Sequence, residues 1–246
     1  MGFDMKLFRI AGLIVAMEPM FPTLMTQAAL YAMSEEEQAL FHGKPDIIID
    51  YSLAFYEKRQ KENPHLSLNE CEYIWTGSEF YRQFIQHDGF LLHSSAVAVD
   101  NKAYLFSAAS GTGKSTHTGL WLQYFGDKAE IINDDKPAIR YIDGHFFAIG
   151  TPWSGKTDLN ANRAVPLQGI AFIERSTTNS IQPMPIQEGI IALMNQTLRP
   201  DDYSMMDRLL FLLDHLFQQI PIYKLACNME LEAVETSYNT MSQGEL

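Results

Sequence analysis

The sequence predicts an α/β protein in which a mixed β-sheet surrounds a phosphate-binding glycine loop, preceded by a small N-terminal α+β region. Three observations carry this prediction. The segment Ser110-Gly-Thr-Gly-Lys-Ser115 lies between an apolar strand pattern and a helix pattern. Two hairpin turns, at 100–102 and 143–144, favour a mixed sheet over a doubly wound parallel one. The chain has 246 residues, 46% of them hydrophobic, which suits one large domain or two small ones.

Charge and cysteine content restrict the class of function. The 18 Lys and Arg residues against 30 Asp and Glu residues give a net charge of −12, which argues against nucleic-acid binding and against docking on an anionic membrane. The two cysteines exclude a disulfide framework and favour a reducing, cytoplasmic location. The apolar run 10–17 is shorter than the about 20 residues of a membrane span and precedes no cleavage site, so we expect a buried strand there.

Residues 1–88 form the expected N-terminal region. Pro22 sets the first turn of a helix, and Ser34 with Glu37 fits a capping box. The polar segment 57–64 is expected to be a loop, and Gly89 suits a left-handed helix cap. The expected elements are a strand over 6–17, helices over 22–33 and 34–43, a strand over 47–50, and a helix over 78–87.

Residues 89–246 form the expected second unit, unless both regions make one continuous globule. Gly126 is expected to end the helix that follows the glycine loop, and Asn228 to cap the last helix. Leucines at helical spacing over 207–218 predict a helix facing the core or a subunit interface. The expected strands are 91–99, 103–107, 129–133, 137–141, 145–149, 169–174 and 220–225, and the expected helices are 116–125, 185–198, 207–218 and one after 228.

The glycine loop has the composition of a phosphate-binding loop. Its glycines let consecutive N–H groups point at phosphate oxygens, and the helix N-terminus adds partial positive charge. Lys114 would reach the β- and γ-phosphates of ATP, and the Ser115 hydroxyl would ligate Mg²⁺. Ala108 stands where the full pattern has its first glycine, which requires a negative φ there. The expected nucleotide-binding residues are Ser110, Gly111, Thr112, Gly113, Lys114, Ser115 and Thr116.

Asp134 and Asp135 end an apolar strand 20 residues after the loop. In phosphoryl-transfer enzymes a carboxylate at such a position holds Mg²⁺, and another accepts the proton of the attacking hydroxyl. Because adjacent residues of an extended strand point to opposite faces, we expect the two carboxylates to have separate roles. The alternative is a polar turn, since Asp-Asp-Lys-Pro is also good turn chemistry.

The order and spacing of these motifs resemble the catalytic core of HPr kinase/phosphorylase, which the phosphoenolpyruvate carboxykinases share more distantly. The matching segments are Leu92-His-Ser-Ser-Ala-Val-Ala-Val-Asp100, Tyr104-Leu-Phe-Ser, the glycine loop, and Ile132-Asn-Asp-Asp135, within residues 90–175. The segment Pro221-Ile-Tyr-Lys-Leu225 resembles the ending of small HPr-kinase-like proteins. Residues 1–88 resemble no part of the bacterial enzyme.

The resemblance implies a mixed-sheet α/β core and ATP-dependent transfer of a phosphoryl group to a serine-type hydroxyl. It implies catalytic roles for Lys114 on the phosphates, for Asp134 as the base and for His93 beside them. Ser115 and Asp135 would hold Mg²⁺. The acceptor would be a small molecule or a serine of a peptide or protein, and relatives of this kind self-assemble, so a homo-oligomer is one expected state.

Other charged residues and one further loop are also candidates for the site, and two alternative functions are open. The segment Thr151-Pro-Trp-Ser-Gly-Lys156 would either close over the phosphates or acceptor, or be an ordinary loop with a packed tryptophan. Lys156 or Arg163 could neutralise transition-state charge. The rivals are a phosphoenolpyruvate carboxykinase-like enzyme and a nucleotide-binding regulatory protein without transferase activity. Weaker site candidates are Glu174, as a later acidic metal ligand, and Arg175 and Arg199.

Overall fold

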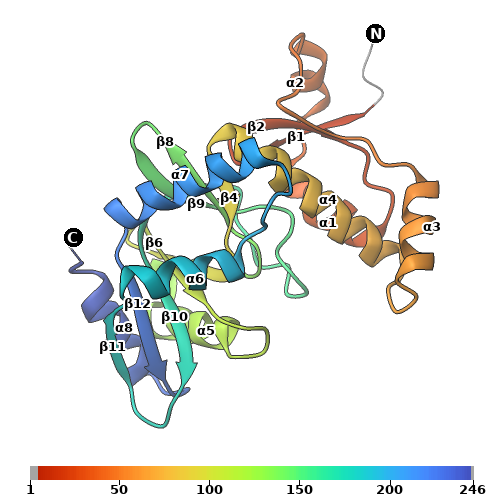
Figure 1. Ribbon diagram of the computed structural model, residues 1–246. Helices are drawn as coiled ribbons and strands as arrows, with labels where there is room; N and C mark the ends of the chain where they lie inside the picture. The colour runs from red at the N-terminus through yellow and green to blue at the C-terminus, as the bar shows by residue number, and fades with distance from the viewer. Residues whose placement is uncertain (1–4, 245–246) are drawn as a thin grey trace.

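The computed structural model describes residues 5–244, and its N-terminal part is built on a three-stranded sheet (Figure 1). The strands are β1 (Lys6–Ile10), β2 (Leu13–Met17) and β3 (Ile47–Ile49). β2 pairs with β1 antiparallel and with β3 parallel. The expected single strand over 6–17 is wrong, because Ala11 and Gly12 take positive φ angles of 52° and 77° and reverse the chain. The strand near 47–50 is confirmed.

The helices of this part begin at side-chain caps. The expected capping box of Ser34 and Glu37 is confirmed, and a second box, formed by Ser67 and Glu70, starts α4 ten residues before the helix expected over 78–87. The loop expected over 57–64 is wrong for residues 57–62, which continue a solvated helix that Ser52 caps. The helices are α1 (Pro22–Ala28), α2 (Glu35–Leu40), α3 (Leu53–Glu62) and α4 (Leu68–Phe84), with 3-10 turns η1 (Ala29–Tyr31) and η2 (Ile85–His87).

The larger sheet is curled and contains both parallel and antiparallel pairs, so the predicted mixed sheet is confirmed. Its order is β4-β8-β9-β10-β6-β5-β7, and β12 pairs with β10 and β11. β10 pairs parallel with β6 and β12 through its second half and antiparallel with β9 through its first, with an irregularity between Leu167 and Gly169. The strands are β4 (Gly89–Leu91), β5 (Ser94–Val99), β6 (Lys102–Ser107), β7 (Ala129–Asn133), β8 (Ala138–Ile142), β9 (His145–Ile149), β10 (Ala164–Arg175), β11 (Ser180–Pro183) and β12 (Ile222–Cys227).

Three expectations for residues 88–246 are wrong. The strand over 91–99 is two strands in different places, because the chain leaves β4 at Leu91 and re-enters the sheet at Ser94. Gly89 is a strand residue, and Asp88 takes the left-handed conformation instead. Asn228 does not cap the last helix, since its side chain accepts the N–H of Glu230 in a preceding turn.

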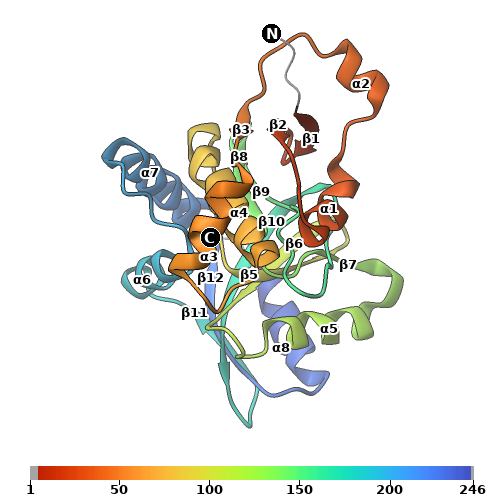
Figure 2. The same cartoon turned by 90° about the vertical axis from the view of Figure 1, so that its right-hand side faces the viewer.

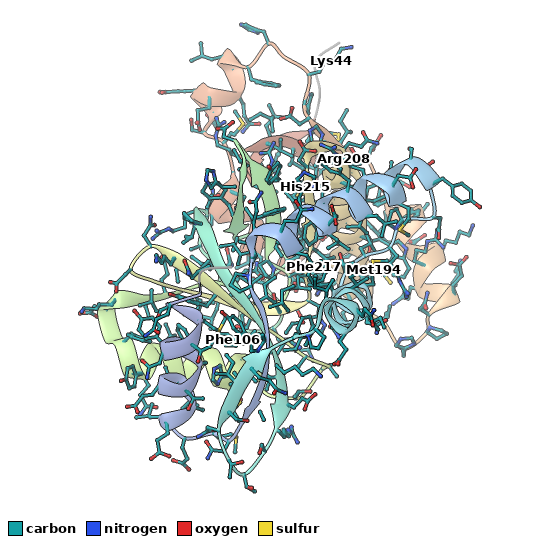
Figure 3. The ribbon with its side chains drawn as sticks, turned by 60° about the vertical axis from the view of Figure 1, so that its left-hand side comes forward. Lys44, Phe106, Met194, Arg208, His215 and Phe217 are labelled. Atoms are coloured by element: carbon teal, nitrogen blue, oxygen red, sulfur yellow. The ribbon has the colours of Figure 1, made fainter. Side chains whose placement is uncertain are left out.

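Helices cover both faces of the large sheet (Figures 1 and 2). One core lies under α6 and α7, and Met194 of α6 and Phe217 of α7 pack against it (Figure 3). Another lies under α5 and α8 around Trp121. A third joins α1, α4 and the small sheet to β8, β9 and Trp153. The remaining helices are α5 (Lys114–Phe125), η3 (Gly126–Lys128), α6 (Ile186–Gln196), α7 (Tyr203–Gln219) and α8 (Glu232–Met241).

Membrane-spanning helices are absent from residues 5–244, where no helix combines the length and the hydrophobicity that crossing a bilayer requires.

Gly150 joins β9 to the loop that reaches the candidate site, and it is packed against backbone. A Cβ at this position would lie 2.0 Å from the carbonyl oxygen of Ala161 and 2.7 Å from that of Ile132. Because backbone cannot move aside as a side chain can, Gly150→Ala should lower the free energy of unfolding by about 3 kcal/mol. Chemical denaturation measures this loss.

The matched control is Gly119→Ala, on the exposed face of α5, where a Cβ meets nothing within 4 Å. It should stabilise the protein by about 0.5–1 kcal/mol through helix propensity. Equal effects of the two substitutions would contradict the packing described for Gly150.

Candidate active site

The glycine loop connects the end of β6 to the start of α5. Gly111 and Gly113 have φ angles of +77° and +124°, and a Cβ on either would meet no atom within 4 Å. Glycine is therefore required here for backbone conformation and not for space. No side chain caps the N-terminus of α5. The first N–H groups of the helix thus remain available to an anion.

Lys114 folds back over this loop. Its Nζ donates a hydrogen bond to the Ala108 carbonyl at 3.1 Å, and only 7% of the residue is exposed. Burial lowers the pKa of Lys114, while the charges of Asp134 and Asp135 oppose that shift. The ammonium group therefore lies in a partly desolvated place that an anionic phosphate would complete.

Arg175, one of the weaker candidates, braces the loop from outside. From the end of β10 its guanidinium donates to the carbonyl oxygens of Gly111 and Thr112, the latter at 3.0 Å. A separate pocket of about 400 Å³ is lined by Thr112, Arg175 and Met229, among other residues. The sequence indicated no partner for Arg175, because β10 and the loop are 60 residues apart and meet only through the β6–β10 pairing.

The two aspartates follow β7 in a turn and not in an extended strand. The Asn133 side chain accepts the N–H groups of Asp135 and Lys136 at 3.0 and 2.8 Å, which ends the strand at Asn133. The expectation that Asp134 and Asp135 point to opposite faces is therefore wrong, and both line one pocket.

Asp134 is held by hydroxyl groups from two parts of the chain. Its carboxylate accepts hydrogen bonds from Ser95 on β5 at 2.6 Å and from Thr157 at 2.9 Å, and the residue is 7% exposed. Ser95 also lies 2.7 Å from the hydroxyl of Thr118 on α5. Ser95 and Thr157 were missed in the sequence, because a lone serine or threonine carries no spacing signal.

The carboxylate of Asp135 is in contact with two side chains. His93 Nε2 lies 3.3 Å from its Oδ1, and the Lys136 ammonium contacts its Oδ2. Burial would raise the pKa of Asp135, but the His93 hydrogen bond and the Lys136 charge outweigh it and hold the pKa below its usual range. His93 is itself oriented by Gln196, whose Oε1 is 3.1 Å from Nδ1.

The predicted residues meet in a pocket of about 520 Å³. Thr112 lies instead on the outer side of the loop. Among the residues that the structure describes, no three His, Cys, Asp or Glu side chains cluster as a metal site. The pocket is lined by His93, Ser110, Gly111, Gly113, Lys114, Ser115, Thr116, Asp134, Asp135, Gly155, Lys156 and Thr157.

The segment Thr151–Lys156 contains the packed tryptophan of one of its two expected descriptions, and its last two residues line the pocket. Trp153 is buried and stacks on Phe80 of α4 with ring centroids 4.8 Å apart. Two residues later Gly155 donates its N–H to the Tyr73 hydroxyl at 2.8 Å, and its carbonyl accepts from Gln27 at the same distance. Packing of the tryptophan therefore holds the following residues at the pocket.

The remaining candidates lie elsewhere. Arg163 binds Glu130 at 2.9 Å and Asn101 at 2.8 Å, beside the β5–β6 turn and away from the glycine loop. Glu174 is an exposed residue of β10, and Arg199 is exposed after α6.

Comparisons with known proteins find matches for the structure and none for the sequence. The sequence matches no protein-family model and no curated protein. The structure matches, among others, the HPr(Ser) kinase/phosphatase of Coxiella burnetii with a TM-score of 0.34 and 8% identity, over 62% of this chain and 98% of that one.

Proposed function

We propose that the protein is an ATP-dependent phosphotransferase that moves a phosphoryl group to a serine-type hydroxyl. The observation that carries this proposal is the convergence, in one pocket, of the glycine loop with Lys114 and of the pair Asp134-Asp135. The loop and the ammonium group suit an anionic phosphate, and the carboxylates suit a metal ion and a proton. The same pocket adjoins a larger one that could hold the acceptor.

The nucleotide would be held mainly by backbone. The N–H groups of residues 110–116 and the Lys114 ammonium would contact the phosphates of ATP, where Lys114 would neutralise charge that develops during transfer. Ser115 and one of the two aspartates would hold Mg²⁺, which would supply further neutralisation of phosphate charge. Catalysis would come from positioning and charge compensation.

The hydroxyl proton must pass to a carboxylate as the oxygen attacks the γ-phosphorus and the bond to ADP breaks. The sequence resemblance assigns this role to Asp134, with Asp135 on the metal. Position favours the reverse, because Asp135 lines both pockets whereas Asp134 lines the pocket at the glycine loop and not the larger one. We therefore propose Asp135 as the base and Asp134, beside α5, as the metal-associated acid.

The direct test measures ADP release by the purified protein with Mg²⁺ and ATP. Candidate acceptors are free amino acids, serine-containing peptides and oxaloacetate. Release that depends on a hydroxyl acceptor is the expected result. ATP binding without turnover on any acceptor would instead indicate a nucleotide-binding regulatory protein. Consumption that depends on oxaloacetate alone would indicate carboxykinase-like chemistry.

A further inference from the structure

A second pocket, of about 770 Å³, lies beside the phosphate pocket and is built largely from the N-terminal region. It shares Asp135, Gly155 and Lys156 with the phosphate pocket, so a molecule seated in it can extend one group to the glycine loop. Its walls come from α1, the start of α4 and the segment 155–158. The remaining lining residues are Thr23, Thr26, Gln27, Ser67, Asn69, Glu70, Tyr73, Ile74 and Asp158.

Gln27 is the most informative residue of this wall. It is 6% exposed, and its Nε2 donates to the Gly155 carbonyl at 2.8 Å, which fixes the orientation of the amide. Its Oε1 is buried and has no hydrogen-bond partner among the described residues. An unpaired buried acceptor is costly, so the site favours a ligand that brings an N–H or O–H donor close to α1.

The charged side chains around the pocket also favour a ligand with a hydrogen-bond donor, in this case a cationic one. The charge of Asp135 is compensated by the Lys136 ammonium. Of the other charged lining groups, Glu70 and Asp158 are anionic, and only Lys156 is cationic. Tyr73 adds a neutral hydroxyl, since burial raises its pKa. The excess of carboxylate over ammonium favours a positively charged ligand group.

From these observations we propose that this pocket is the acceptor site and that its ligand is a hydroxyl compound with a cationic nitrogen near the hydroxyl. This inference rests on the proposed phosphotransferase function and adds the place and the charge of the acceptor. The hydroxyl lies toward Asp135, and the cationic nitrogen lies toward Glu70, Asp158 and Gln27. Such a group is found in a free amino alcohol and in a serine flanked by Lys or Arg.

Glu70 allows a test that leaves the helix start intact. It is the third helical residue of the capping box, a position that glutamine also satisfies, so Glu70→Gln removes the charge and keeps the cap. Glu37→Gln makes the same change in the capping box of α2 and is the matched control. Glu70→Gln should raise KM for cationic acceptors about fivefold, an effect that weakens at high salt, and the control should not.

Two pairs of candidate acceptors test the charge of the acceptor and whether it is a small molecule or a peptide. Ethanolamine is compared with glycerol, and a serine peptide with flanking lysines is compared with one with flanking glutamates. The cationic member of each pair should be the better acceptor. Preference for ethanolamine identifies a small molecule as the source, and preference for the lysine peptide identifies a peptide. Equal use of both members of both pairs, or an equal effect of Glu70→Gln on them, overturns the inference.

Ile74→Trp provides a second variant, because Ile74 lines this pocket and is 41% exposed, so the larger ring fills space without disturbing the core. It should raise KM for the acceptor more than tenfold and leave the affinity for Mg²⁺ and ATP unchanged. If transfer requires Lys114 but Ile74→Trp has no effect, the acceptor site is elsewhere and the phosphotransferase proposal stands. If no probe is phosphorylated and ATP does not bind, the proposed function itself has failed.

Discussion

Replacing Lys114 by alanine should reduce phosphoryl transfer by about 10²–10³-fold or more, because a preorganised positive group is removed from the place where charge develops. The side chain is buried over the glycine loop, and its hydrogen bond to Ala108 shows that no water-filled gap separates it from the loop backbone. Initial rates of ADP release at saturating acceptor measure the loss.

The matched control for this variant is Lys102→Ala. Lys102 is the exposed first residue of β6, at the opposite end of the strand that leads into the glycine loop. Its removal should leave the rate unchanged. Thermal unfolding of both variants should show a cooperative transition, which separates loss of chemistry from loss of fold. Full activity of Lys114→Ala would remove the glycine loop from the proposed mechanism.

Asp135→Asn should lower kcat by about 10²–10⁴-fold and leave KM for ATP nearly unchanged, because the amide keeps the shape of the side chain but cannot accept the hydroxyl proton. Asp134→Asn should behave differently: its main effect should be a higher requirement for Mg²⁺, with part of the activity recovered at high Mg²⁺ concentration. Rate measurements over a series of Mg²⁺ concentrations distinguish the two variants. The opposite pattern would restore the assignment made from the sequence, with Asp134 as the base.

The pH dependence of the rate provides an independent check on Asp135. Its pKa is held below the usual range, so the carboxylate stays ionised as pH falls through the value of about 3.9 typical of aspartate. The activity should therefore show no acid limb from Asp135 between about pH 8 and pH 5. His93→Ala removes one of the interactions that lower this pKa, so any acid limb should move to higher pH in that variant.

Local sequence patterns were sufficient for elements whose ends carry specific residues. The turns at Asp100-Asn101 and Asp143-Gly144, the capping box at Ser34 and the helix end at Gly126 are confirmed. The coarse class, a mixed α/β fold, is confirmed as well. These features depend on positive φ angles or on hydrogen bonds within a few residues, so the sequence alone encodes them.

The errors occur where distant contacts decide the structure. The helix α3 has almost no apolar periodicity, and its polar second half looks the same as a loop in the sequence. The chain between Leu91 and Ser94 leaves one part of the sheet for another, although its hydrophobic pattern continues without a break. Neither feature can be derived from propensity, because sheet pairing and burial against other elements determine both.

The candidate site divides in the same way. The glycine loop and the aspartate pair were recognisable because they are contiguous. The residues that hold or extend the pocket, among them Ser95, Thr157, Tyr73 and Gln27, come from segments up to 130 residues apart. Each is a common polar residue without a motif around it. Only the fold brings them together, through the packing of α1 and α4 against the segment 151–158.

The brace formed by Arg175 has a consequence for the thermodynamics of nucleotide binding. Its guanidinium donates hydrogen bonds to the carbonyl oxygens of Gly111 and Thr112 and so restricts the conformations of the loop. A restricted loop loses less conformational entropy on binding a ligand than a loop without such hydrogen bonds. Calorimetry should therefore find a smaller entropic penalty for the natural protein than for Arg175→Ala, whose loop would have to order itself anew at every binding event.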